Sequence, residues 1–190
     1  MQLKKIFIIL VMLLISNIKA QQIENRCNIH SFADFEQGIY YKDVDNKFAP
    51  FIGVWKNVTG NTTFKVTMFK TEDTDYGGYF LDTLEGHYEI ILNEGQANEN
   101  IICTSRFLPG NPSVQLPPLI QGSSCSGNGF GGSVLDMCIG PPKYQLNGML
   151  QISLIPGTNT AHWKITRKRG LVIGQEIDYT LPKDIILTKQ

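Results

Sequence analysis

Apolar and polar residues alternate along several stretches of the chain beyond residue 50. Within residues 62–71, Phe64, Val66 and Met68 occupy every second position, and the residues between them are polar. A period of two predicts a β-strand with one buried face, because an amphipathic helix would repeat its apolar positions every three or four residues. The same alternation returns over residues 148–155 and 160–169.

Turn residues separate the alternating stretches at short intervals. The strands predicted in this way are 51–58, 62–71, 79–83, 87–92, 98–108, 148–155, 160–169 and 185–189. Several short strands, short links and almost no helix predict an all-β fold, an antiparallel meander closed into a barrel of about eight strands. A β-sandwich is the alternative, since both architectures use the same strand pattern.

Two segments do not alternate. Residues 21–48 are polar and predict an irregular N-terminal arm, with a short helix around residues 31–37. Residues 109–142 are rich in proline and glycine and predict a long loop, because such a density of breakers disfavours a helix or a central strand. A long irregular stretch in a compact domain is usually functional or braced. The β domain is therefore expected over residues 49–190, with this loop inside it.

The first 20 residues have the features of a secretory signal peptide. Lys4 and Lys5 precede the apolar run Ile6–Ile15, and Ala20 provides a small residue at the cleavage site. The apolar run is too short to span a bilayer. The sequence therefore predicts an exported protein, periplasmic or secreted, without membrane insertion.

Charge excludes one class of partner for the exported chain. The 17 basic residues less Lys4, Lys5 and Lys19 leave 14 against 17 acidic residues, a net charge of −3. This balance carries no basic footprint, so no nucleic-acid partner is expected. The basic cluster from Lys164 to Arg169 lies on an alternating segment and fits a solvated strand edge.

Four cysteines, Cys27, Cys103, Cys125 and Cys138, predict disulfides in an exported chain. Three pairings are possible. The local one, Cys125–Cys138, would close a loop and leave Cys27 to pair with Cys103. Closing a loop of that length stabilises the fold by roughly 3 kcal/mol in the chain-entropy model.

The glycine run inside that stretch, Gly127–Gly132, matches G-x-G-x-x-G letter by letter. A dinucleotide site needs a buried strand before the glycines and a helix after them. Prolines precede and follow this run, so a loop held by cysteines is the better interpretation. No cofactor is expected.

No catalytic or metal-binding motif stands out in the sequence. Gly131–Leu135 lacks the last glycine of G-x-S-x-G. The histidines His30, His87 and His162 are scattered without ligand spacing, so no metal site is expected. A non-enzymatic protein is predicted, with a hydrolase of dispersed residues as a minor alternative.

Gly53-Val54-Trp55 on the first predicted strand resembles the G-x-W signature of lipocalins. A glycine there lets a neighbouring segment cross close to the backbone, and the indole closes one end of the barrel. In lipocalins a late basic residue packs over this Trp, and Arg167 or Arg169 is the nearest match. The resemblance implies a lipocalin-like barrel.

A wider resemblance covers the chain from about residue 38 to its end. Tyr40–Asp43, Phe51–Lys56, Gly60–Phe64 and Leu181–Gln190 resemble an uncharacterised family of small exported bacterial proteins. The resemblance implies export and a lipocalin-like sheet. It brings no catalytic residues, because none are known for the family.

Two functions remain open at this point. A barrel of about eight strands can enclose one small apolar ligand, and the alternating strands would line it with Phe64, Val66, Met68, Tyr88, Ile90, Leu150, Ile152 and Leu154. The same side chains would equally fill a solid core. In the second hypothesis the loop 109–142 binds a protein or glycan partner.

Overall fold

A computed structural model describes residues 21–29, 31–138, 146–167 and 179–190. The predicted signal peptide lies outside these residues. The strands of the described part are β1 (Gln22–Asn25), β2 (Ile39–Lys42), β3 (Gly53–Thr59), β4 (Thr62–Asp75), β5 (Phe80–Leu92), β6 (Asn100–Thr104), β7 (Phe107–Leu108), β8 (Asn111–Gln115), β9 (Ile120–Ser123), β10 (Gly129–Asp136), β11 (Leu146–Leu154), β12 (Thr160–Arg167) and β13 (Asp184–Lys189).

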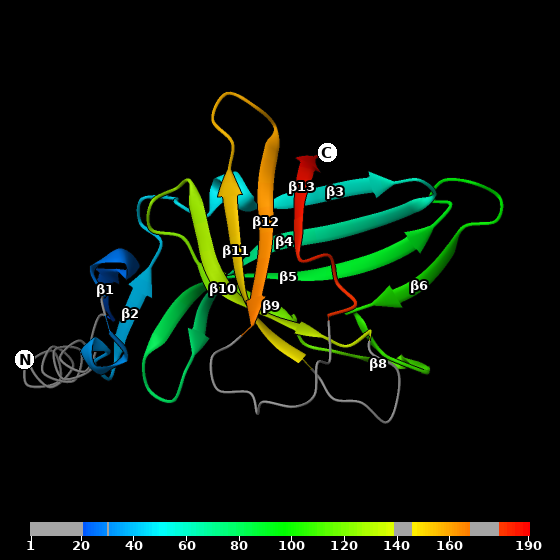
Figure 1. Cartoon of the computed structure of the whole chain (residues 1–190). Coiled ribbons are helices and arrows are strands. Elements are labelled where there is room, and N and C mark those ends of the chain that lie inside the picture. The colour runs from blue at the N-terminus through cyan, green and yellow to red at the C-terminus, as the bar shows by residue number, and fades with distance from the viewer. Residues whose placement is uncertain (1–20, 30, 139–145, 168–178) are drawn as a thin grey trace, which may run out of the picture.

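Eight of these strands form a closed antiparallel barrel (Figure 1). They follow one another in the order β5-β4-β3-β13-β12-β11-β10-β9, and β9 returns to pair with β5. The predicted all-β barrel of about eight strands is confirmed, and the alternative sandwich is not formed. Closure removes the free edges that an open sheet would leave.

The edge of β5 that faces away from β4 serves three partners in succession. β2 pairs with it in parallel at Phe80 and Leu81, and β9 pairs with it from Leu84 to Gly86. β6 then pairs with it from Glu89 to Leu92. Only the middle partner belongs to the barrel, so β2 and β6 extend the sheet beyond it at the two ends of β5.

The N-terminal arm is more regular than predicted. It contains β1 and β2, which pair in parallel, and the predicted helix is a single 3-10 turn, Phe32–Asp34. The arm attaches to the barrel through Asp82 of β5, which accepts hydrogen bonds from the Tyr40 hydroxyl at 2.5 Å and the Asp43 amide at 2.9 Å. The strands were missed because four residues are too few to establish a period.

The loop predicted over residues 109–142 is also wrong in large part, since β8, β9 and β10 lie within it and the last two are barrel strands. Gly122 of β9 and Gly132 of β10 face each other in register. A Cβ on either glycine would lie 2.7 Å from the tip of the Phe130 ring. The glycines therefore make room for Phe130 inside the barrel, and they do not form a phosphate loop.

The disulfides join Cys27 to Cys125 and Cys103 to Cys138, not the pairs favoured from the sequence. Cys125 and Cys138 stand at opposite ends of β10, which has 8 residues. A strand of that length spans about 26 Å, whereas bridged Cα atoms lie within about 7 Å. One bridge ties the N-terminal arm to the β9–β10 connection, and the other ties β6 to the end of β10.

Candidate functional site

The side chains predicted to bind a ligand lie inside the barrel. Ile90 and Leu154 are partly buried and pack against the core. The other six are between 0 and 3% exposed: Phe64, Val66, Met68, Tyr88, Leu150 and Ile152. The structure thus brings all eight together in one hydrophobic cluster.

Aromatic rings meet across the barrel interior. Phe64 of β4 contacts Trp163 of β12 edge to face, with ring centroids 5.3 Å apart. Those strands are separated along the barrel wall by β3 and β13, so the contact crosses the interior. The ring centroids of Phe51 and Phe130 lie 6.3 Å apart in the same cluster. These side chains are engaged with one another, as in a packed core.

Tyr88 is the one predicted ligand-binding residue with a polar group, and its hydroxyl is already bonded to the backbone. It donates to the Leu135 carbonyl at 2.8 Å and accepts from the Met137 amide at 2.9 Å. Burial raises the pKa of this phenol above its ordinary value. Tyr88 therefore fastens β10 to β5 and has no donor left for a ligand.

The basic residue over Trp55 is Lys189, not the predicted Arg167. Lys189 of β13 places its Nζ 5.3 Å from the centroid of the Trp55 ring and donates to the Pro50 carbonyl at 2.8 Å. Gly53 has a φ of +128°, and a Cβ there would lie 3.2 Å from the Lys189 Cε. The backbone angle therefore favours glycine, and the Lys189 side chain packs close over it.

Arg167, the residue expected over Trp55, lies elsewhere in the barrel. It stands opposite Gly148 on β11, whereas Lys189 stands directly opposite Trp55. Arg169 lies outside the described residues. The sequence signal that was missed is Lys189 itself, a basic residue at the end of the last alternating strand.

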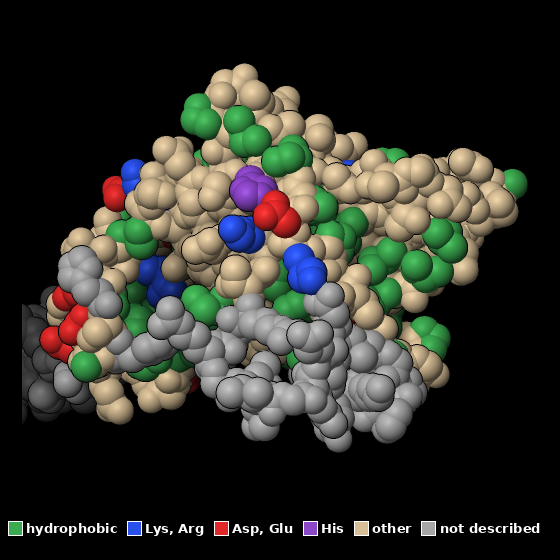
Figure 2. All heavy atoms as spheres, viewed as in Figure 1, with side chains coloured by type: hydrophobic (Ala, Val, Ile, Leu, Met, Phe, Trp, Pro, Cys, Tyr) green, Lys and Arg blue, Asp and Glu red, His purple; other side chains and the backbone are tan. Residues whose placement is uncertain are grey.

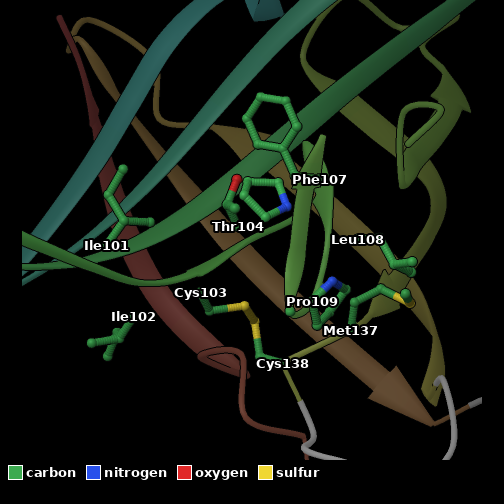
Figure 3. Close-up of a pocket in the computed structure, with 11 residues that line it drawn as sticks. Ile101, Ile102, Cys103, Thr104, Phe107, Leu108, Pro109, Met137 and Cys138 are labelled. Atoms are coloured by element: carbon green, nitrogen blue, oxygen red, sulfur yellow. A yellow bond between two sulfur atoms is a disulfide. The ribbon is translucent and has the colours of Figure 1, made fainter. Parts of the chain in front are cut away.

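A different apolar site, a pocket, lies outside the barrel between β6, the β7–β8 hairpin and the chain that follows β10 (Figure 3). The pocket there has a volume of about 280 Å³ and is lined by Ile101, Ile102, Cys103, Thr104, Phe107, Leu108, Pro109, Gly110, Pro112, Met137 and Cys138. Ile101, Ile102, Phe107 and Leu108 are 50, 52, 38 and 39% exposed. Large apolar side chains gathered at such exposure mark an interaction site more often than a solvated surface.

The pocket walls are fixed to the barrel at two points, and a third bond closes the hairpin at its base. The Cys103–Cys138 disulfide joins β6 to the chain after β10. The buried Ser105 hydroxyl accepts from the Tyr88 amide at 2.8 Å, and the Arg106 carbonyl accepts from the Leu116 amide at 2.8 Å at the hairpin base. These attachments preorganise the apolar walls, so the pocket does not depend on a ligand to form it.

Among the described residues, none that lines the pocket is charged. Arg106 is the only charged residue between Asn100 and Leu135. Its guanidinium donates to the Thr67 hydroxyl at 3.2 Å and lies 3.6 Å from Glu89, which also pairs with Lys65 at 2.9 Å. Arg106 is thus occupied on the outer face of β4 and β5. In the view of Figure 2, apolar side chains reach the surface around the position of β6, with no charged side chain among them.

A buried polar cluster at the other end of β5 has a structural role. The Lys70 Nζ lies 2.7 Å from the Asp82 Oδ2, and Asp82 also accepts the two hydrogen bonds from the arm. Burial alone would raise the pKa of Asp82, but the hydrogen bonds from Lys70, Tyr40 and the Asp43 amide outweigh it and hold the pKa below its ordinary value. A carboxylate so fully paired holds the arm in place and is poorly suited to proton transfer.

Within the described residues, no group of three or more His, Cys, Asp or Glu side chains is arranged to hold a metal ion. In the same part of the chain, no helix has the length and apolar character needed to cross a membrane. The two disulfides are typical of a protein in an oxidising compartment.

The fold and the pocket together define a closed eight-stranded antiparallel barrel with extra strands that carry an apolar pocket outside the barrel. Residues 1–190 match the model of the Family of unknown function (DUF6705), and the chain belongs to that family. No curated protein and no solved structure matches the chain.

Proposed function

We propose that this protein is an exported, non-enzymatic, lipocalin-like binding protein that takes a small apolar ligand in the outer pocket between β6, the β7–β8 hairpin and the Cys103–Cys138 disulfide. Export is supported by the N-terminal Lys-rich and apolar segment and by the two disulfides. The lipocalin-like character is supported by the barrel and by the packing of Lys189 over Trp55.

One observation carries the proposal. The pocket gathers half-exposed apolar side chains that are fixed by a disulfide, and Thr104 is the only polar side chain among its described lining residues. Ligand sites of small molecules are mostly apolar with few polar groups. The interior side chains are, by contrast, in contact with each other across the barrel. A ligand in the outer pocket displaces water from apolar surface, whereas a ligand in the interior would have to displace packed rings.

The Pro/Gly-rich segment takes part in this function in a narrower way than the sequence suggested. Pro109, Gly110 and Pro112 line the pocket, while β9 and β10 of the same segment belong to the barrel wall. The recognition surface that we propose is therefore the hairpin and β6, not the whole of residues 109–142.

Native mass spectrometry tests the proposal. The exported full-length protein is incubated with octan-1-ol, and the native spectrum is compared with the denatured one. The wild type should retain an added mass in the native spectrum only. Leu108→Glu should lose it, because a carboxylate in an apolar site weakens binding by roughly tenfold or more.

Met149→Glu is the matched control. Met149 is as exposed as the pocket residues, but it lies on β11, away from the pocket. This variant should keep the added mass. A wild type that never acquires the mass, or a Leu108→Glu variant that keeps it, would contradict the proposed site.

A further inference from the structure

We infer that the outer pocket selects uncharged ligands that carry a hydrogen-bond acceptor, such as alcohols, esters or ketones with a short hydrocarbon chain, and that Thr104 is the residue that recognises the acceptor. The inference rests on the proposed function, since it names the class of ligand for the same pocket. It follows from the charges around the pocket, from the state of the Thr104 hydroxyl and from the pocket's size.

The charges near the pocket disfavour an anionic ligand. The lining residues that the structure describes include no cation, and Arg106 is held by Glu89 and Thr67. An acidic side chain lies beside Cys138: Asp136 is fully buried and accepts from the Cys138 amide at 2.9 Å. A carboxylate placed in the pocket would lose its water without gaining a counter-ion among the described residues.

The hydroxyl of Thr104 is positioned to donate. Its Oγ1 accepts a hydrogen bond from the Arg106 amide at 3.2 Å, which leaves the hydroxyl proton to point elsewhere. No acceptor within the described part of the chain takes that proton. Figure 3 shows Thr104 between Phe107 on one side and the Cys103–Cys138 disulfide on the other. A ligand oxygen in the pocket would satisfy this donor.

The size of the pocket sets the size of the ligand. Its volume of about 280 Å³ lies at the small end of ligand sites. Since a water molecule occupies about 30 Å³ of the liquid, the pocket holds on the order of ten heavy atoms. A chain of about eight carbons with one oxygen fits this limit, with its hydrocarbon part against Ile101, Leu108 and the two prolines.

Methyl NMR titration of the full-length oxidised protein tests the inference with two probes of nearly equal size, octan-1-ol and octanoate at pH 7.5. The methyl signals of Ile101, Ile102 and Leu108 report on the pocket, and that of Ile186 on β13 reports on a remote exposed site. Octan-1-ol should shift the pocket signals with an affinity at least about tenfold higher than octanoate. The Ile186 signal should not move.

Two substitutions test the role of Thr104. Thr104→Val keeps the shape and removes the donor, and it should weaken octan-1-ol binding by about three- to tenfold. Thr104→Ser keeps the donor and should retain most of the affinity.

The possible failures are distinct. Equal affinities for octanoate and octan-1-ol at the pocket signals would overturn the charge selectivity. Wild-type affinity in Thr104→Val would overturn the role of the hydroxyl. If neither probe moves the pocket signals, the proposed function itself is wrong.

Discussion

The barrel interior and the outer pocket are made from the same kinds of side chains, yet their side chains have different neighbours. In the interior, Phe64 contacts Trp163 from the opposite wall, and each is almost completely buried. In the pocket, Ile102 and Phe107 are 52 and 38% exposed and line the same hollow as the Cys103–Cys138 disulfide. An apolar pattern along a strand therefore identifies an apolar face. The exposure of its side chains in the structure then shows whether that face is core or a binding surface.

The same contrast holds for how the two regions are fixed. The interior is held by the closed ring of strands and by contacts between rings from different strands. The pocket is held from outside, by the Cys103–Cys138 disulfide and by backbone bonds at Ser105 and Arg106. Substitutions in the two regions should consequently affect different properties, stability in one and binding in the other.

The largest expected effect is on stability and comes from Trp163→Ala. Trp163 is fully buried, and its indole Nε1 donates to the Pro182 carbonyl at 2.8 Å. Removing it should lower the free energy of unfolding by about 3–5 kcal/mol. Ile102→Ala in the half-exposed pocket wall should cost under about 1 kcal/mol. Urea denaturation compares the two variants, and a similar cost for both would show that the pocket wall belongs to the core.

A smaller effect, and one that links the two regions, is expected from replacing Cys103 and Cys138 by serine. The bridge closes a separation of 35 residues, and its loss should cost roughly 2–4 kcal/mol. Octan-1-ol binding should be lost as well, because β6 is then no longer tied to the chain after β10. Denaturation and the methyl titration measure the two effects.

Replacing Cys27 and Cys125 by serine is the matched control. This bridge closes a separation of 98 residues, so the chain-entropy model predicts at least as large a loss of stability. Neither Cys27 nor Cys125 lines the pocket, so this change should leave octan-1-ol affinity unchanged. Loss of binding in both double variants would mean that stability, not the position of β6, controls the pocket.

The strands that could be predicted from the sequence are those with an unbroken alternation. β4, β11, β12 and β13 match the predicted strands closely, because alternation is a local property of a half-buried strand. β9 and β10 were missed because glycines replace apolar residues at inward positions, where Phe130 fills the space. Turn-forming residues then outweighed the period.

Contacts between distant residues could not be predicted in the same way. The pairing of the cysteines depends on how strands far apart in the chain are aligned. So does the position of Lys189, which lies opposite Trp55 where Arg167 was expected. The pocket did leave a trace in the sequence, namely the charge-free stretch from Asn100 to Leu135 interrupted by Arg106 alone. The functional loop was predicted from the proline and glycine content of residues 109–142, which did not show which part of it is exposed.

The smallest expected effect is a pH dependence of the unfolding free energy, which arises where β5 contacts the start of the β7–β8 hairpin. His87 of β5 is buried, and its Nδ1 lies 3.2 Å from the Ser105 hydroxyl at the start of the hairpin. Burial, and next the charge of Arg106, lower the pKa of His87 below 6.5, while the Ser105 carbonyl and the charges of Glu89 and Glu85 only partly oppose them.

A histidine whose pKa is lower in the folded state takes up its proton first in the unfolded state. Its contribution to stability is therefore complete above about pH 6.5 and is lost as the pH falls from there toward the folded pKa, by at most about 1.4 kcal/mol per pH unit. His87→Gln should reduce the loss of unfolding free energy between pH 7.5 and 5.5, and so should Arg106→Gln, which removes the second cause. Urea denaturation at both pH values measures this difference, and an unchanged acid loss in His87→Gln would show that this contact does not sense pH through this ring.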